Sequence, residues 1–218
     1  MDTELLAVFN DNGAPLGTKP RAAVHRDHDW HWLVFVWAVR RDDHGNLRML
    51  LQLRSRDGDP YQGQIDAPAG GHVMAEEGHL QGALREFREE IGVSLDGDDL
   101  AHLGEKKLEL TYGHCRRVIQ HFYLCTRPLT LDEVGFSDEV GGVVEVDLDA
   151  LADLIDGRGN TVPGTARFPA APSRHDAVEI TGGHLAAYPP SILNMFHLSL
   201  QAIRQYFLHG HIDATVWD

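Results

Sequence analysis

One segment constrains what this chain can fold into more than any other. Between Gly78 and Ile91, apolar or small residues recur at spacings of three and four, which places them on one face of a helix. These residues are Leu80, Ala83, Leu84, Phe87 and Ile91. Gly92 follows as a C-cap. The segment therefore predicts an amphipathic helix that packs on a core and turns its polar face to a cleft.

The polar face of this helix carries a cluster of carboxylates. Glu86, Glu89 and Glu90 point to the same side because residues three and four apart are neighbours on a helix. Like charges at this spacing destabilise a helix by roughly 0.2–0.5 kcal/mol per pair. A hard divalent cation between them would remove the repulsion, and carboxylate oxygens suit Mg²⁺ or Mn²⁺ rather than Zn²⁺. The helix is therefore a candidate metal site.

Residues around the carboxylates support the same interpretation. Glu77 lies at the junction of loop and helix, eight residues before Arg85, and a pair between them would pin the loop onto the helix. Gly70 and Gly71 allow the backbone to approach the metal closely, so that a glycine carbonyl can join the ligands.

An E-x-x-E-E cluster by itself is usually a solvated helix face, but the complete spacing is far more specific. The pattern reads Gly71, five residues, Glu77, seven residues, Arg85-Glu86, an apolar residue, one residue, Glu89-Glu90, one residue, Gly92 and an apolar residue. This pattern resembles the Nudix box at every fixed position. Phe87 fills an apolar slot where the family usually has Ile, Leu or Val.

The resemblance extends over roughly residues 28–156 and implies an α/β fold, a Nudix-type α/β/α sandwich built on a mixed sheet. It implies a hydrolase that uses water to cleave a diphosphate bond in a nucleoside diphosphate linked to another moiety, or in a similar small diphosphate. The metal ligands it implies are the Gly70 carbonyl, Glu86, Glu89 and Glu90, with Mg²⁺ or Mn²⁺ as cofactor. The candidate catalytic residues are Arg85, Glu86, Glu89, Glu90 and Glu139.

Two of these assignments leave alternatives open. The general base is either a box glutamate or Glu139 on a later loop. For Glu139, the alternative to a catalytic role is that of an ordinary surface acid. Arg54 and Arg56 are candidate substrate-binding residues because guanidinium groups suit bidentate phosphate contact. Their alternative is a solvated strand end.

A second enzyme is also similar to part of the chain. The segment around His25, together with His31 and the run Leu51–Arg56, looks like isopentenyl-diphosphate isomerase, a relative on the same fold. That enzyme places histidines of its metal site at positions like His25 and His31, and it needs a cysteine in the loop before the box. The loop from Tyr61 to Ala69 contains no cysteine. The resemblance therefore favours the isomerase-like subgroup of Nudix hydrolases, with isomerase activity as an alternative.

Two further interpretations complete the alternatives. A Nudix domain that only senses nucleotides would predict loss of a box glutamate or a fused DNA-binding module, and the sequence shows neither. His25, His28 and His31 could form another metal site, although dispersed histidines are more often surface or packed groups.

Periodicity and turn residues divide the remaining chain into elements. We expect residues 1–27 to form an N-terminal strand or hairpin extension, and residues 157–218 a C-terminal loop and helix packed on the domain. The expected strands are Glu4–Asn10, Trp30–Arg40, Leu47–Leu53, Leu103–Thr111, Val118–Thr126 and Val143–Val146. The expected helices are Leu148–Ile155 and Pro190–Leu208, and the expected loops include Ser55–Gly71 and Gly157–Arg174.

Charge and composition limit the partners. The formal net charge of −14 argues against binding the phosphate backbone of nucleic acid. It still permits a small diphosphate-containing substrate, because a metal ion supplies positive charge locally. The longest apolar stretch, Trp32–Val39, is far shorter than the roughly 20 residues that span a bilayer. With no signal peptide evident and Cys115 and Cys125 expected to be reduced packing residues, we expect a cytoplasmic protein without a membrane partner. A homodimer stays open.

Overall fold

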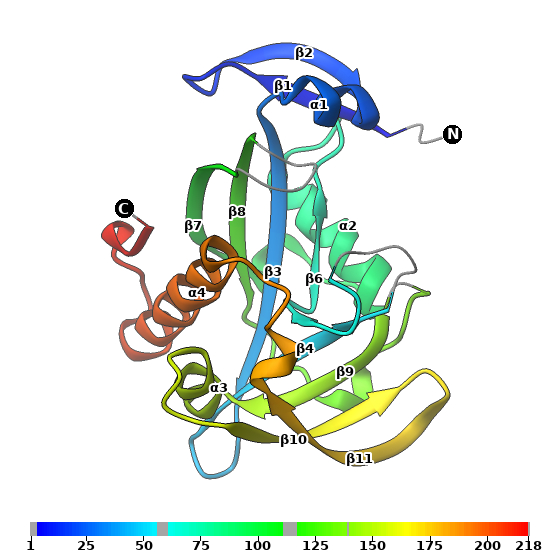
Figure 1. Cartoon of the computed structure of the whole chain (residues 1–218), viewed down its shortest axis with the longest axis vertical. Helices are drawn as coiled ribbons and strands as arrows, with labels where there is room; N and C mark the ends of the chain where they lie inside the picture. Colours follow the sequence, from blue (N-terminus) through cyan, green and yellow to red (C-terminus); the bar gives the residue numbers. More distant parts are fainter. Residues whose placement is uncertain (1–3, 56–60, 111–116, 139, 218) are drawn as a thin grey trace.

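A mixed β-sheet organises the fold, which is described by a computed structural model covering residues 4–55, 61–110, 117–138 and 140–217. Its strands are β3 (His31–Arg41), β4 (Leu47–Arg54), β5 (Ile65–Asp66), β6 (Ala69–His72), β7 (Leu100–Glu109), β8 (Arg117–Cys125), β9 (Val140–Asp147), β10 (Thr161–Phe168) and β11 (Ala171–Thr181). The main order is β11-β10-β9-β4-β3-β8-β7, while β5 pairs with β4 and β6 pairs with β3 (Figure 1).

The long strand β3 lies at the centre of this sheet. It runs parallel to β8 over residues 31–38, and its other edge pairs first with β6 and then with β4. Its sequence is rich in Trp, Val and Phe, residue types that suit a pleated and buried surface. The expected strand Trp30–Arg40 is therefore present, and it is buried on both faces along most of its length.

Helices cover the two faces of the sheet. Val34, Val36 and Ala38 pack towards α2 (His79–Ile91), in a cluster that also contains Phe87. The alternate β3 side chains pack into a second cluster with α3 (Leu148–Ile155) and α4 (Pro190–His209). Figure 1 shows α2 and α4 on opposite sides of β3. The predicted α/β/α sandwich with a mixed sheet is therefore confirmed.

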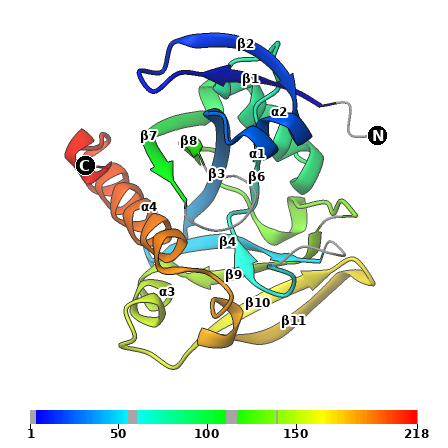
Figure 2. The same ribbon diagram turned by 45° about the horizontal axis from the view of Figure 1, so that its top comes forward.

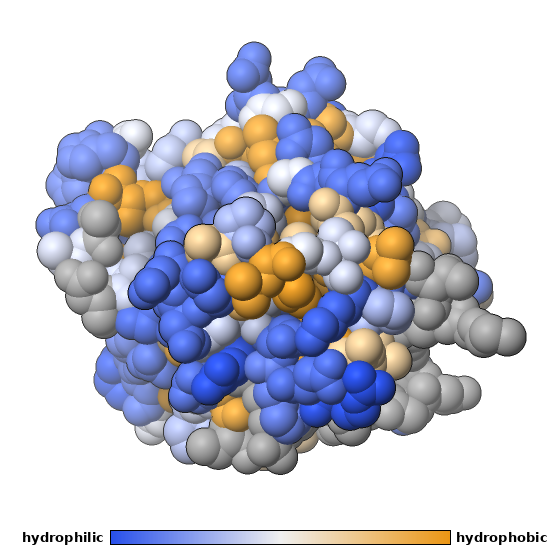
Figure 3. Space-filling view, turned by 90° about the horizontal axis from the view of Figure 1, so that it is seen from above, coloured by the Kyte–Doolittle hydropathy of each residue, from blue (hydrophilic) through white to orange (hydrophobic). Residues whose placement is uncertain are grey.

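The N-terminal segment forms a separate layer. Strands β1 (Leu5–Phe9) and β2 (Pro15–Pro20) make the predicted hairpin. Helix α1 (Arg21–Asp27) follows, in a segment where the sequence predicts only a strand or hairpin extension. The view from above shows mainly hydrophilic side chains here, with apolar ones in small separate patches (Figure 3). Among the described residues, no helix is long and apolar enough to cross a membrane.

The prediction of a loop is wrong for two segments, because each of them contains strands. The segment Ser55–Gly71 includes β5 and most of β6, whose few residues and glycines give no alternating pattern. The segment Gly157–Arg174 includes β10 and the start of β11. Figure 2 shows β10 beside β9, with β11 beyond it. Strand β11 forms the outer edge of the sheet and is mostly exposed, so its sequence lacks the apolar run of a buried strand.

Short 3₁₀ helices complete the described elements. They are η1 (Gly97–Asp99), η2 (Leu131–Glu133), η3 (Gly182–His184) and η4 (Ala214–Trp217). Trp217 of η4 stacks on Phe122 of β8, and its indole N–H donates to the Leu103 carbonyl at 2.7 Å. This contact holds the last described segment against β7.

Removal of the Phe87 ring should show how strongly α2 depends on the sheet. Phe87 is 0% exposed, and Phe87→Ala should lower the free energy of unfolding by about 3–5 kcal/mol because it leaves a cavity. Urea unfolding followed by circular dichroism measures this change. Leu208→Ala is the control, since Leu208 is 73% exposed on α4 and should change stability by less than about 0.5 kcal/mol. Equal losses in the two variants would contradict the packing described.

Candidate functional site

The site is built at the C-terminal end of α2. The helix ends at Gly92, whose φ of 73° is the left-handed conformation that glycine adopts without strain. Glu89 and Glu90 lie in its last turn, where the helix macrodipole is negative. Carboxylates are unfavourable at this end of a helix, so their presence adds to the need for a positive charge nearby.

Arg85 supplies one positive charge and joins the helix to the preceding loop. Its Nη2 donates to Glu77 Oε1 at 2.6 Å and to the His72 carbonyl at 2.8 Å. Its Nη1 donates to Glu86 Oε1 at 2.8 Å and to Glu89 Oε2 at 3.0 Å. Burial acts to lower the pKa of Arg85, but hydrogen bonds to Glu77 and the charge of Glu86 raise it overall. The predicted Glu77–Arg85 pair is therefore present.

Glu86 lies against the backbone of Gly71, which together with Gly70 is here called the glycine cradle. A Cβ atom added to Gly71 would lie 2.2 Å from Glu86 Oε1, well inside any permitted contact. Gly71 therefore leaves the space that the carboxylate occupies, and the sequence pattern requires glycine here for a steric reason. Burial raises the pKa of Glu86, against the lowering effect of Arg85.

Glu90 reaches the other side of the same cradle. Its Oε2 accepts from Gln52 Nε2 at 3.0 Å and from the Gly70 N–H at 3.2 Å. Burial raises its pKa to about 8, and the nearby charge of Glu86 adds to the shift. Glu86 and Glu90 are thus costly to ionise together in the protein alone.

These donors fit a hard divalent cation. Their chemistry is oxygen only, with two partly buried carboxylates and a third, Glu89, that is half exposed. Gly70 lies next to Glu90, which places its peptide group within the same small region. Such a set of carboxylates and backbone is typical of Mg²⁺ and Mn²⁺ sites.

Arg54 lies near this group, at the end of β4. Its Nη1 forms an ion pair with Asp66 Oδ2 at 2.8 Å, and Tyr188 donates to the same oxygen at 3.2 Å. The charges of Arg54 and Asp66 both influence the pKa of Glu90. Arg54 is therefore beside the carboxylates. Arg56 and Glu139, predicted as a substrate residue and a base, lie outside the described residues.

Sequence reasoning missed Gln52 and Asp66. The two face each other as paired residues of β4 and β5. Gln52 is only 4% exposed and interrupts the apolar run of its strand, which was a usable signal for a functional role. Asp66 followed no readable pattern, because β5 has only two residues.

Three histidines, here called the N-terminal histidine cluster, meet where α1, β3 and β6 approach one another. His25, His31 and His72 offer nitrogen atoms that all lie within 4.8 Å of one another. His25 Nε2 and His72 Nε2 are 3.0 Å apart, and His31 Nδ1 contacts the Asp29 carbonyl at 2.9 Å. The sequence pointed to His28 as the third member, but the fold brings His72 to that place. Such a cluster offers nitrogen ligands to a transition metal.

Cys125 fits the expected packing role. It is fully buried as a free thiol, and burial raises its pKa to about 11, so it stays protonated and unreactive. Cys115 lies outside the described residues.

Comparison with known proteins agrees with this geometry. Residues 30–167 match the model of the NUDIX domain. An uncharacterized Nudix hydrolase of Clostridium acetobutylicum is 27% identical over 160 residues, which cover 72% of this chain and 77% of that protein. Nudix hydrolase 3 of Arabidopsis thaliana is 41% identical over 99 residues, but these are only 45% of this chain and 12% of that protein.

A solved structure supports the fold. The crystal structure of DR0079 from Deinococcus radiodurans aligns with a TM-score of 0.53 at 18% identity, over 71% of this chain and 90% of that one. At this identity the likeness concerns the fold alone. The isomerase-like subgroup and the domain bounds 28–156 stay predictions.

The raised pKa of Glu90 predicts how stability and metal affinity change with pH. Its proton is held more tightly in the folded chain, with a pKa of about 8, than at the ordinary value of 4.5. The metal-free protein therefore keeps this contribution to stability below about pH 4.5 and loses it as the pH rises through about 8. A cation competes with that proton, so calorimetric titration should show Mn²⁺ affinity rising from about pH 6 to about pH 9. A flat profile would contradict the assignment.

A methyl group at Gly71 should disturb the metal centre while leaving the fold intact. Gly71→Ala places a Cβ where Glu86 Oε1 lies, so the carboxylate must move away. We expect Mn²⁺ affinity to fall by about 10-fold or more, as measured by calorimetry, with an unchanged circular dichroism spectrum. Gly182→Ala is the matched control, because nothing lies within 4 Å of its added Cβ. Unchanged affinity in Gly71→Ala would exclude Glu86 as a ligand at this position.

Proposed function

The chain belongs to the Nudix family and is a Nudix-type hydrolase, and we propose that it cleaves the diphosphate bond of a nucleoside diphosphate linked to another moiety, or of a similar small diphosphate. One observation carries the proposal. Glu86 and Glu90 gather against the Gly70–Gly71 backbone while Arg85 ties the third carboxylate, Glu89, to the same group.

In this proposal, the Gly70 carbonyl, Glu86, Glu89 and Glu90 hold Mg²⁺ or Mn²⁺. When bound, the ion neutralises charge on the diphosphate oxygens and makes water a better nucleophile. Positive charge at this place matters in a chain with a net charge of −14, which otherwise repels a polyanionic substrate.

The surrounding side chains keep the carboxylates in position. Arg85 holds Glu86 and Glu89 through one guanidinium nitrogen and fixes the loop through the other. Gln52 orients Glu90 by donating to Oε2. A box glutamate is proposed as the general base that accepts a proton from the attacking water. Glu139 remains the alternative base.

Substrate binding is assigned to the end of β4. The Arg54 guanidinium lies near Glu90 and is partly exposed, so it can reach an incoming phosphate. Its ion pair with Asp66 holds the side chain at this place in the absence of substrate. Arg56, two residues further on, is proposed for the same role.

A second candidate function is isomerisation of a small diphosphate. The observation in its favour is the N-terminal histidine cluster, whose member His72 follows Gly71 on β6. Against it, the loop Tyr61–Ala69 supplies no thiol for the proton transfers of such an isomerase. Hydrolysis is therefore the function that the site supports best.

The decisive assay is a panel of diphosphate compounds with Mg²⁺ or Mn²⁺, in which products are analysed by chromatography. We expect metal-dependent hydrolysis of at least one compound. Glu90→Gln should reduce kcat on the order of 100-fold or more, because it removes a charged ligand. Glu76→Gln is the control, since Glu76 is exposed and outside the carboxylate group.

Three results would contradict this proposal. They are hydrolysis that persists at full rate in Glu90→Gln, equal losses in Glu76→Gln, and an isomerised product in place of a hydrolysed one. The last result would favour the second candidate function.

A further inference from the structure

A second group of histidines lies on the α2 side of the sheet, here called the β7–β8 histidine cluster. It consists of His79, the first residue of α2, His102 of β7 and His121 of β8. Their ligand nitrogens all lie within 4.8 Å of one another. The rings of His79 and His121 stack at 4.1 Å, and the ring of His102 is 5.5 Å from that of His79. The proposed hydrolase chemistry uses none of these residues.

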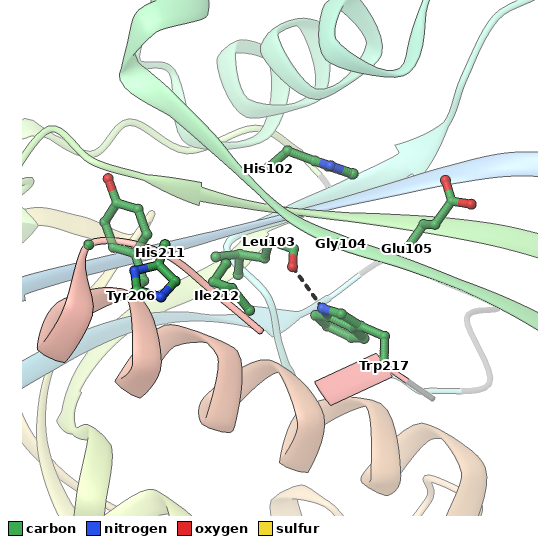
Figure 4. A pocket seen from close by; sticks show the side chains of 9 residues that line it. His102, Leu103, Gly104, Glu105, Tyr206, His211, Ile212 and Trp217 are labelled. Atoms are coloured by element: carbon green, nitrogen blue, oxygen red, sulfur yellow. Dashed lines mark hydrogen bonds between the residues drawn. The ribbon is translucent and has the colours of Figure 1, made fainter. Parts of the chain in front are cut away.

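A β-bulge in β7 gathers these side chains. His102 pairs with Tyr123, and Glu105 pairs with His121. On β7 the two residues are three positions apart, whereas their partners on β8 are only two positions apart. In a regular strand, residues three apart point to opposite faces. The extra residue at the bulge puts His102 and Glu105 on one face. Figure 4 shows both directed away from the side of β7 that carries Trp217.

His121 shows that this cluster is chemically incomplete. Its side chain is almost fully buried, and neither of its ring nitrogens has a hydrogen-bond partner among the described residues. Buried polar atoms are normally paired, so an unpartnered pair of nitrogens needs an explanation. Burial lowers the pKa of His121 to about 3, so its ring is neutral at pH 7. Neutral imidazole is the form that binds a metal.

The groups beside His79 and His121 leave ring nitrogens free to bind a ligand. Glu105 Oε2 lies 3.4 Å from His121 Nδ1, and the Tyr123 hydroxyl contacts His79 Nδ1. Metal-binding histidines commonly present one nitrogen to the ion while the other contacts a carboxylate or similar group. The Tyr123 hydroxyl contacts His79 Nδ1, while Glu105 lies beside His121 Nδ1 without a hydrogen bond to it, so both ring nitrogens of His121 are open to a ligand. His102 is exposed and gives access from solvent.

We propose that His79, His102 and His121 form a metal site that binds Zn²⁺ or another divalent ion preferring nitrogen ligands. The site differs in chemistry from the carboxylate centre, which offers oxygen atoms. Zinc bound by three histidines needs Zn–N distances of about 2.0–2.1 Å, so ligand nitrogens must lie roughly 3.4 Å apart. The ligand nitrogens lie within 4.8 Å of one another, and the stacked rings of His79 and His121, as well as the exposed ring of His102, must turn to direct their nitrogens at one ion. Bound metal would join the start of α2 to β7 and β8.

The test measures Zn²⁺ affinity by competition with a chromophoric chelator, in excess Mg²⁺ to occupy the carboxylate centre. All variants carry His25→Ala, which removes the N-terminal histidine cluster as a competing site. This parent should bind one Zn²⁺ ion at the β7–β8 cluster. Addition of His102→Ala should weaken binding by about 10-fold or more. Because His102 is exposed, this change should not disturb folding.

The matched control is His44→Ala in the same parent, since His44 is exposed in the turn after β3. It should leave the affinity unchanged. Zn²⁺ at about 100 times the Kd of the parent should raise the Tm of the parent and the control by roughly 5–10 °C, and that of the His102→Ala variant by at most about half as much. The proposal is overturned if His102→Ala binds Zn²⁺ as tightly as its parent, or if His44→Ala weakens binding equally.

A spectroscopic measurement locates the ion independently. The Trp32 ring lies 5.4 Å from the His121 ring and 5.6 Å from the His79 ring. Co²⁺ bound at the cluster should quench the emission of Trp32 and give the visible absorption of a four-coordinate ion. Trp32→Phe identifies the share of emission that belongs to this residue. Quenching that is the same with and without His102 would place the ion elsewhere and contradict the proposal.

Discussion

The geometry of the carboxylate centre depends on the guanidinium of Arg85. This group binds Glu77 and the His72 carbonyl on one side, and Glu86 and Glu89 on the other. Arginine keeps its charge at any ordinary pH and offers donors in a rigid plane, so it can hold acids that would otherwise repel one another. The loop, the helix and two of the ligands are thus arranged before any cation arrives. One charge does not balance the group, which explains why burial still raises the pKa values of Glu86 and Glu90.

The central strand β3 gives this arrangement a rigid base. Its pairing with β6 fixes Gly70 and Gly71, and its Val34, Val36 and Ala38 side chains pack with the underside of α2. The glycines and the carboxylates are therefore positioned by one strand. The same strand separates the two histidine clusters, because His31 and Trp32 are successive residues and face opposite sides. Sites for oxygen-preferring and nitrogen-preferring ions can coexist on such a frame without sharing ligands.

Elements and contacts could be predicted from the sequence where a regular spacing of apolar residues coincides with a fixed chemical motif. The bounds of α2 and α3, the face of Glu86 and the Glu77–Arg85 pair follow from spacing alone, because a helix brings such residues together locally. Strand β11 escaped prediction because an exposed edge strand has no apolar run, and β10 because Pro163 and Gly164 interrupt its few apolar residues. The roles of Gln52 and His72 depend on strand pairing between distant segments, which local periodicity does not contain. The β7–β8 cluster was invisible for a further reason, since it depends on a bulge that shifts the register by one residue.

The contact between Trp217 and Gly104 has a consequence for communication across the sheet. Gly104 has a φ of +141°, and an added Cβ would lie 2.2 Å from the Trp217 indole nitrogen. The indole therefore occupies the space that a side chain at the bulge would need, and it also binds the carbonyl of Leu103 across 114 positions of sequence. Because the bulge decides the direction of His102 and Glu105, η4 packs on one face against the same piece of backbone that gathers the imidazole groups on the other. The late segment around Trp217 thus supports the geometry of side chains that it never touches.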